Sequence, residues 1–172
     1  MILSFYREKI NFIRYYFTKI LFTMKKSILF ISCLLFTTTL VFSQADKIVG
    51  IWVPAKGTSQ VRIFKATNGK YYGKVEWLET DKDKLDVNNP DEASQNKKIW
   101  GLMILKDFSY NAAKNRWEGG TVYDPDNGKT YDCYMWFDGD NNNTKMTLKG
   151  YVLGMKFVGR AEDWTREAEL RK

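Results

Sequence analysis

The chain has 172 residues, of which 27 are Lys or Arg, 20 are Asp or Glu and none is His. Without His, it can form neither a Ser-His-Asp nor a Cys-His relay, and it has no imidazole ligand for zinc. Most of the net charge of +7 belongs to residues 1–43, which carry six basic groups and one acidic group and leave 21 basic and 19 acidic groups in residues 44–172. Such a nearly neutral body argues against a nucleic-acid partner.

The N-terminal region has the pattern of an export signal. Lys25-Lys26 precede an uncharged run over residues 28–42, which ends in Val41-Phe42-Ser43. A basic start, an apolar run and small residues before a cut are typical of a secretory signal peptide. The run is shorter than the ~20 residues that cross a bilayer.

These features predict three parts of the chain. We expect translation to begin at Met24, so that residues 1–23 are an upstream extension, residues 24–43 are the signal peptide and residues 44–172 are one mature domain. The mature domain then has no membrane span and lies in the periplasm or outside the cell. Cys133 is its only cysteine, which excludes an intramolecular disulfide.

Short runs with alternating apolar and polar residues follow one another along the body, as in β-strands. In chain order they cover residues 48–53, 60–63, 71–78, 100–106, 116–123, 129–137, 145–152 and 155–164. Asn68-Gly69 between the second and third runs predicts a hairpin with a type I′ turn. Eight antiparallel strands at this spacing predict an all-β fold, a single closed barrel without exposed sheet edges.

The segment of residues 80–98 interrupts this pattern. It is nineteen residues long and mostly polar, and it is either a functional lid or disordered. Residues 91–96 are expected to form one helical turn.

Several motifs occur in an order that resembles a known family. They are Gly50-Ile51-Trp52, Tyr72-Gly73-Lys74-Val75-Glu76-Trp77, Asp86-Val87-Asn88-Asn89-Pro90-Asp91, Trp117-Glu118-Gly119-Gly120, Tyr123-Asp124-Pro125-Asp126-Asn127-Gly128-Lys129-Thr130-Tyr131 and Trp164-Thr165-Arg166. Over residues 48–167 the chain resembles domain-of-unknown-function family 2147, whose members are small exported bacterial proteins. The resemblance implies a lipocalin-like (calycin-like) barrel and export, and it implies no particular activity.

Trp52 and Arg166 also resemble the barrel closure of lipocalins, in which an Arg from the last strand covers a Trp on the first. A guanidinium stacked on an indole is favourable by roughly 0.5–2 kcal/mol. This resemblance implies a structural role for both residues.

An eight-stranded barrel is either filled by its own side chains or holds one small ligand. Tyr131, Cys133, Met135 and Phe137 share one face, which we expect to be interior, with Cys133 an inert thiol. Inward glycines would leave room for a ligand; the candidates are Gly73, Gly119, Gly150 and Gly159.

We expect the mature domain to be a non-catalytic barrel that binds a small, partly apolar and lipid-like molecule. The candidate ligand-contacting residues are Asp86, Asn89, Trp117, Tyr123, Asp124, Lys129, Tyr131 and Arg160. Lys129 or Arg160 could meet an acidic head group. The alternative is a filled barrel that contacts other proteins of the cell envelope through outer aromatic residues such as Tyr72, Tyr134 and Trp136.

Other chemistries are weakly supported. Asp138-x-Asp140-x-Asn142 matches the start of a calcium loop, but Asn143 and Lys149 stand where such a loop needs Gly and Glu. We therefore expect turns there and no metal or cofactor. Glycoside hydrolysis would need two carboxylates that face each other across a cleft, which the sequence does not show.

Overall fold

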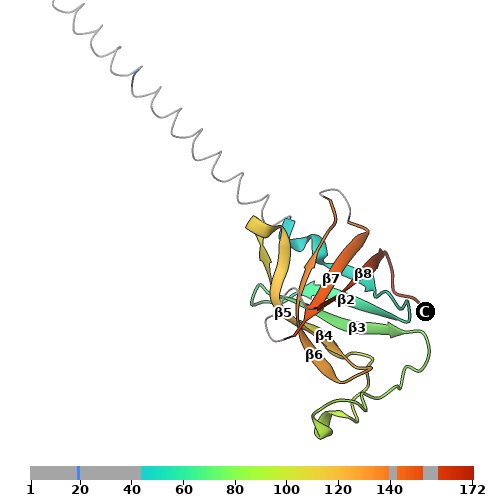
Figure 1. Ribbon diagram of the computed structural model, residues 1–172. Coiled ribbons are helices and arrows are strands. Elements are labelled where there is room, and N and C mark those ends of the chain that lie inside the picture. The colour runs from blue at the N-terminus through green and yellow to red at the C-terminus, as the bar shows by residue number, and fades with distance from the viewer. Residues whose placement is uncertain (1–18, 20–43, 140–142, 153–158) are drawn as a thin grey trace, which may run out of the picture. The chain divides into compact units, whose positions relative to one another are not determined.

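The computed structural model describes residue 19 and residues 44–139, 143–152 and 159–172. Within these, Ala45–Lys172 forms one unit, a closed barrel in which each strand pairs antiparallel with its neighbour in the sequence and β1 closes on β8 (Figure 1). The strands are β1 (Gly50–Val53), β2 (Ser59–Lys65), β3 (Tyr71–Leu78), β4 (Met103–Asn111), β5 (Arg116–Asp124), β6 (Lys129–Trp136), β7 (Lys145–Tyr151) and β8 (Gly159–Glu167). Three single 3₁₀ turns accompany them: η1 (Asp46–Ile48), η2 (Glu92–Ser94) and η3 (Ala112–Lys114).

The predicted all-β barrel of eight strands is confirmed, and some of its strands show the expected alternation of burial. In β3, for example, buried and half-buried residues alternate over all eight positions. Among the described residues no helix is both long and apolar enough to cross a membrane. The predicted signal peptide and upstream extension, and residues 155–158 of the last predicted strand, lie outside the described residues.

The fourth strand differs from its prediction at both ends. It begins at Met103 instead of residue 100, because Gly101 has a φ of +88° and interrupts the extended backbone. It then continues to Asn111 through an irregularity at Asp107, whose φ is +64°. Leu105 and Phe108 are both fully buried although they stand three residues apart, and only a bulge places such a pair on one face.

The predicted turn type after β2 is wrong, although the hairpin itself is present. Gly69 has a φ of +78°, but Asn68 does not have the positive φ that a type I′ turn needs. The Gly69 amide instead donates to the Ala66 carbonyl over 2.9 Å, and Asn68 Oδ1 accepts from the Lys70 amide. The side-chain bond stabilises a longer loop in which only glycine adopts the left-handed conformation.

One end of the barrel is plugged by η1 and by large aromatic side chains. Trp52 and Trp117 are fully buried there, and each indole donates to a carbonyl of the entering chain: Trp52 to Ile48 over 2.8 Å and Trp117 to Ala45 over 2.9 Å. Tyr71 donates to the Asp46 carboxylate over 2.6 Å. These bonds satisfy buried polar groups where the chain enters the barrel, so this end is closed.

Two expected vacancies inside the barrel are filled. A Cβ added to Gly73 would lie 2.7 Å from the Leu105 side chain, so Leu105 occupies the space that the missing side chain leaves. Gly120, not Gly119, faces the interior, and there Phe108 takes the space. The expectation that Gly73 and Gly119 leave room for a ligand is therefore wrong, since neighbouring strands supply large side chains opposite the small ones.

Candidate functional site

The 80–98 segment folds against the opposite end of the barrel. It contains η2 and a bridge between Leu85 and Lys98. The Asp91 side chain caps η2, and Gln95 donates to the Asn89 carbonyl over 3.0 Å. The segment was predicted to be either a functional lid or disordered. In the structure it is ordered, because its own turns hold it.

Two loops that are far apart in the sequence, residues 80–98 and the β5–β6 turn, contact each other at this end. The Asn88 amide donates to the carbonyls of Pro125 and Asp126, over 3.2 and 3.1 Å. Gly128 is buried against the Asn88 carbonyl, and an added Cβ would lie only 1.8 Å from that oxygen. We call this contact between Asn88 and residues 125–128 the clasp.

Asp86 anchors the same loop. It is fully buried, and its two carboxylate oxygens accept from the Tyr123 hydroxyl and the Asn89 amide, each over 2.7 Å. Burial and the bond to Asp86 raise the pKa of Tyr123 to about 12, so this hydroxyl stays protonated and donates at all physiological pH values. Asp86 therefore acts as a buried tether between the loop and β5.

A hollow of about 300 Å³ lies between this loop and the barrel wall. Its apolar side is formed by Leu102, Met103 and Ile104, and its polar lining consists of Asn89, Ser94, Lys97, Lys106, Thr121, Tyr123 and Thr130, with Pro90 at one side. We call it the loop-side hollow. Its volume is at the lower end of the range for small-molecule sites.

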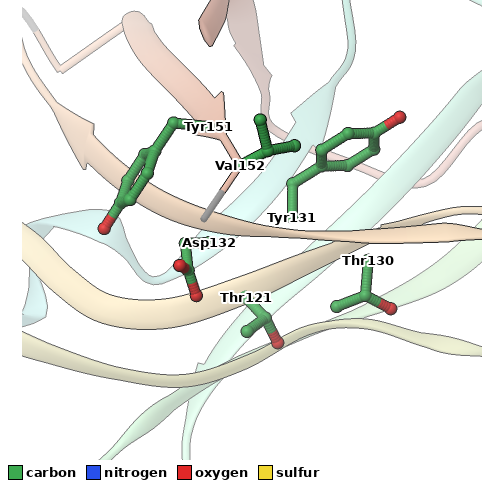
Figure 2. A pocket seen from close by; sticks show the side chains of 6 residues that line it. All are labelled: Thr121, Thr130, Tyr131, Asp132, Tyr151 and Val152. Carbon is green, nitrogen blue, oxygen red and sulfur yellow. The ribbon is translucent and has the colours of Figure 1, made fainter. Parts of the chain in front are cut away.

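A second hollow of about 480 Å³ adjoins the first. It lies where β7 ends, and it is lined by Thr121, Thr130, Tyr131, Asp132, Tyr151 and Val152 (Figure 2). We call it the strand-end hollow. Thr121 and Thr130 line both hollows, so the two hollows adjoin, and we refer to them together as the groove.

The groove follows a row of residues on the outer face of the barrel. Lys106 pairs with Thr121, Thr121 with Asp132, and Asp132 with Tyr151. Their chain neighbours Gly120 and Cys133 pair on the inner face, so this row points outward. This row is therefore part of the outer wall, whereas Tyr131, which also lines the strand-end hollow, lies on the inner face of β6 with Cys133.

The sequence-predicted candidates divide among several places. Asn89 and Tyr123 line the loop-side hollow and Tyr131 lines the strand-end hollow. Asp86 supports the loop, and Asp124 caps its own turn by accepting from the Asp126 amide over 3.0 Å. These five residues are brought together at one end of the barrel.

The other three candidates line neither hollow, although Lys129 pairs with Asp124 at the same end of the barrel. Trp117 is buried at the plugged end, where it packs edge-on against Phe137 at 5.3 Å between ring centroids. Lys129 and Arg160 are both exposed and line neither hollow. Trp117 and Tyr123 stand at opposite ends of β5, and a candidate list taken from the sequence does not separate the two ends of one strand.

Trp52 and Arg166 lie together at the plugged end. The guanidinium carbon of Arg166 is 4.3 Å from the centre of the Trp52 indole, and the same group donates to the carbonyls of Val49 and Lys47. Gly50 permits this approach, because a Cβ there would lie 2.4 Å from Arg166 Nη1.

Cys133 is fully buried in the interior, and burial, followed by the charge of Glu162, raises the pKa of its thiol. Glu162 lies on the inner face of β8, because it pairs with the core residue Leu148. Its carboxylate accepts from the Trp164 indole over 2.5 Å. Sequence analysis did not single out this carboxylate, although Glu162 lies within the predicted run of residues 155–164.

Only part of the calcium-like motif, Asp138-x-Asp140-x-Asn142, lies within the residues that the structure describes. Asp138 accepts from the Trp136 indole over 2.8 Å and from the Thr147 hydroxyl over 3.2 Å. Asp140 and Asn142 lie outside the described residues. The Asp138 carboxylate is thus engaged in holding β6 and β7 together.

Sequence analysis missed most of the lining residues of the groove, among them Ser94, Lys97, Lys106 and Thr121. Each is an ordinary polar residue on a strand or loop, and nothing in its local pattern distinguishes it from a solvated surface residue. Only the folding of the 80–98 segment against β4 and β5 turns these residues into the lining of a hollow.

The fold is similar to that of a solved structure, described as "Protein HP1028 from the human pathogen Helicobacter pylori belongs to the lipocalin family". The match has a TM-score of 0.61 at 23% sequence identity and covers 71% of this chain and 84% of the other. At this identity the similarity concerns the fold, which is lipocalin-like. A comparison with curated proteins found no match.

A family model described as "Uncharacterized protein conserved in bacteria (DUF2147)" matches residues 50–166, which span the barrel from β1 to the last residues of β8. The match includes the clasp, the Asp86 tether and the Trp52–Arg166 pair. The chain therefore belongs to this family of bacterial proteins.

Proposed function

We propose that the protein is an exported, non-catalytic barrel that binds a small, partly apolar molecule in the groove on its outer wall. The observation that carries the proposal is the loop-side hollow, where an apolar floor meets converging polar side chains. Such a combination buries the body of a ligand and orients its polar end.

The surrounding contacts support a preformed site. The clasp and the Asp86 tether hold the loop in place before any ligand arrives, which reduces the entropy that binding must overcome. The side-chain hydroxyls of Thr121 and Thr130 form no hydrogen bond with the described residues, so they are available to a ligand.

Export is supported by the N-terminal pattern and by the start of the barrel unit. The expected cleavage after Ser43 leaves Gln44 at the new N-terminus, and the unit begins at Ala45. Ala45 already belongs to the plugged end, where its carbonyl accepts from Trp117. Cleavage at this position would leave every described contact of the barrel intact.

The proposal is tested with protein expressed from the full chain and purified from the exported fraction without added ligand. The intact mass is expected to begin at Gln44, and a mass that retains residues 24–43 would contradict export with cleavage. Native mass spectrometry is expected to show an additional mass that disappears on denaturation.

Fluorescence titration with the neutral probe N-phenyl-1-naphthylamine then locates the site. Thr121→Tyr fills the wall that both hollows share, and it is expected to abolish probe binding. Thr165→Tyr is the matched control, because it introduces the same side chain at an exposed position on β8. If the probe bound both variants equally, or failed to bind the unmodified protein, the groove would not be the binding site.

A second candidate function rests on a different observation. Tyr134 and Trp136 stack on the outer wall at 5.4 Å between ring centroids, and the Arg116 guanidinium lies 4.5 Å from the centre of the Tyr134 ring. Aromatic side chains and Arg are enriched where proteins bind one another. Trp136→Ala is expected to release a bound protein partner if this face is an interface, and to leave probe binding in the groove unchanged.

A further inference from the structure

The loop-side hollow has an uneven distribution of charge. Lys97 and Lys106 both line it, and of the described residues that line it none is acidic. The Tyr123 hydroxyl is already committed to Asp86. The charged groups at this hollow are therefore two ammonium groups above an apolar floor.

Neither ammonium is neutralised by a carboxylate that lines the hollow. Lys97 donates to the Ser94 hydroxyl over 3.0 Å, and the Asp91 carboxylate near it caps η2. The Lys106 ammonium forms no hydrogen bond or ion pair with any described residue, although its charge helps to lower the pKa of Asp107. Asp107, its chain neighbour, is bound by the Tyr72 hydroxyl over 2.7 Å and by Lys70 over 3.4 Å.

The adjoining strand-end hollow has the opposite character. Its one charged lining residue is Asp132, and the remaining lining consists of two Thr, two Tyr and one Val. An anionic group placed there would be repelled by Asp132, while an apolar or hydroxylated group would lie against Tyr151 and Val152. The two halves of the groove thus differ in the sign of their charge.

We propose that the groove takes an organic anion, with the acid group beside Lys97 and Lys106 and the apolar body directed along the wall towards Tyr151. This inference rests on the proposed function and adds the ligand's charge and direction. It assigns the acid group to Lys97 and Lys106 in place of Lys129 or Arg160, because the latter two line neither hollow.

Two fluorescent probes test the proposal, because they differ by one acid group. The anion 8-anilino-1-naphthalenesulfonate and its neutral parent N-phenyl-1-naphthylamine are titrated against the purified protein at fixed ionic strength. The anion is expected to bind more tightly. Lys97→Gln and Lys106→Gln are each expected to weaken its binding about two- to fivefold, the range for exposed charge pairs, and to leave the neutral probe unaffected.

Lys149→Gln is the matched control. It removes the same charge from the outer face of β7 without touching either hollow, so it corrects for the general loss of positive charge. Asp132→Asn removes the negative charge of the strand-end hollow. It is expected to leave the affinity for the neutral probe unchanged and to make binding of the anion slightly tighter.

The outcomes separate the two proposals. Binding of the neutral probe without preference for the anion would overturn the charge assignment and leave the small-molecule function standing. A preference for the anion that disappears in Lys129→Gln or Arg160→Gln, but persists in Lys97→Gln and Lys106→Gln, would overturn the site of the acid group. Failure of both probes would overturn the proposed function itself.

Discussion

Glu118 is the side chain whose ionisation is most strongly shifted towards the charged state on the described surface. Burial opposes the charge of its carboxylate, but hydrogen bonds from Asn111, Arg116 and Lys114 outweigh it and lower the pKa to about 2. Its ordinary pKa is 4.5. The charged form is therefore bound more strongly in the folded barrel than in the unfolded chain.

This shift predicts an acid-dependent part of the stability. A carboxylate with a lowered pKa contributes its full stabilisation above its unfolded pKa and loses it as the pH falls towards the folded value. Glu118→Gln is expected to lower the free energy of unfolding by about 1–2 kcal/mol at pH 6, and the difference from the unmodified protein is expected to shrink between pH 4.5 and pH 2. Urea denaturation at several pH values measures it.

Glu92→Gln provides the comparison for this experiment. Glu92 lies exposed in η2 and forms no side-chain hydrogen bond or ion pair with the described residues. A pH-independent difference for Glu118→Gln, or an equal effect of both variants, would contradict the ionic role of Glu118.

At the scale of elements, the clasp shows why a glycine stands in the β5–β6 turn. Gly128 combines a φ of +69° with direct contact to the Asn88 carbonyl. Gly69 has a similar φ of +78°, but nothing lies within 4 Å of its Cβ position. An alanine at Gly69 would therefore introduce backbone strain alone, whereas an alanine at Gly128 would introduce backbone strain and a steric clash.

We expect Gly69→Ala to cost about 1–2 kcal/mol, the cost of a left-handed conformation for a residue with a Cβ. Gly128→Ala is expected to cost more and also to displace residues 80–98, because the added Cβ would collide with Asn88. Thermal unfolding gives the stability, and amide hydrogen exchange in the 80–98 segment reports the displacement. Equal stability losses and unchanged exchange in the loop would show that the clasp contributes nothing.

The plugged end is the second element on which the barrel depends. Trp52 links η1, β1 and β8 through its bond to Ile48 and its contact with Arg166. Trp52→Ala is expected to lower the free energy of unfolding by roughly 3–5 kcal/mol, because it removes a fully buried aromatic side chain. An unchanged melting temperature would contradict the structural role.

Arg166→Gln tests the covering residue, and Arg171→Gln is its counterpart. Arg171 also lies over an indole, with 5.0 Å between its guanidinium carbon and the centre of the Trp77 ring, but at the exposed C-terminal tail. Arg166→Gln is expected to lower the free energy of unfolding more than Arg171→Gln does, because it also removes the hydrogen bonds to the Val49 and Lys47 carbonyls.

At the scale of the whole molecule, Cys133 reports on the integrity of the barrel. Its thiol is fully buried, and burial raises its pKa, so the reactive thiolate is scarce and inaccessible. We expect a thiol reagent to leave the native protein unlabelled and to react only as fast as the barrel unfolds. Thr130→Cys places a second thiol at an exposed position of β6 and is expected to take up one label at once. Rapid labelling of the unmodified protein would show that the interior is open.

Much of the architecture follows from local pattern. The period-two alternation in β3 and the apolar face of Cys133 and Met135 identify strands and interior residues, because burial on one side of a sheet imposes that period. The bulge at Asp107 was missed. It places Leu105 and Phe108 in the space beside Gly73 and Gly120, which lie on the two neighbouring strands. Local pattern holds no information about a partner strand.

The sequence by itself determined that the chain is an all-β barrel of eight strands, and its motifs identified the family of bacterial proteins to which it belongs. Only the tertiary structure decided where the motif residues act. It placed Asn88 against Gly128, made Asp86 a buried tether and moved Trp117 to the plugged end. It also made a groove from Lys97, Lys106 and Thr121, because a hollow arises where separate segments pack imperfectly, and such packing is a property of non-local contacts.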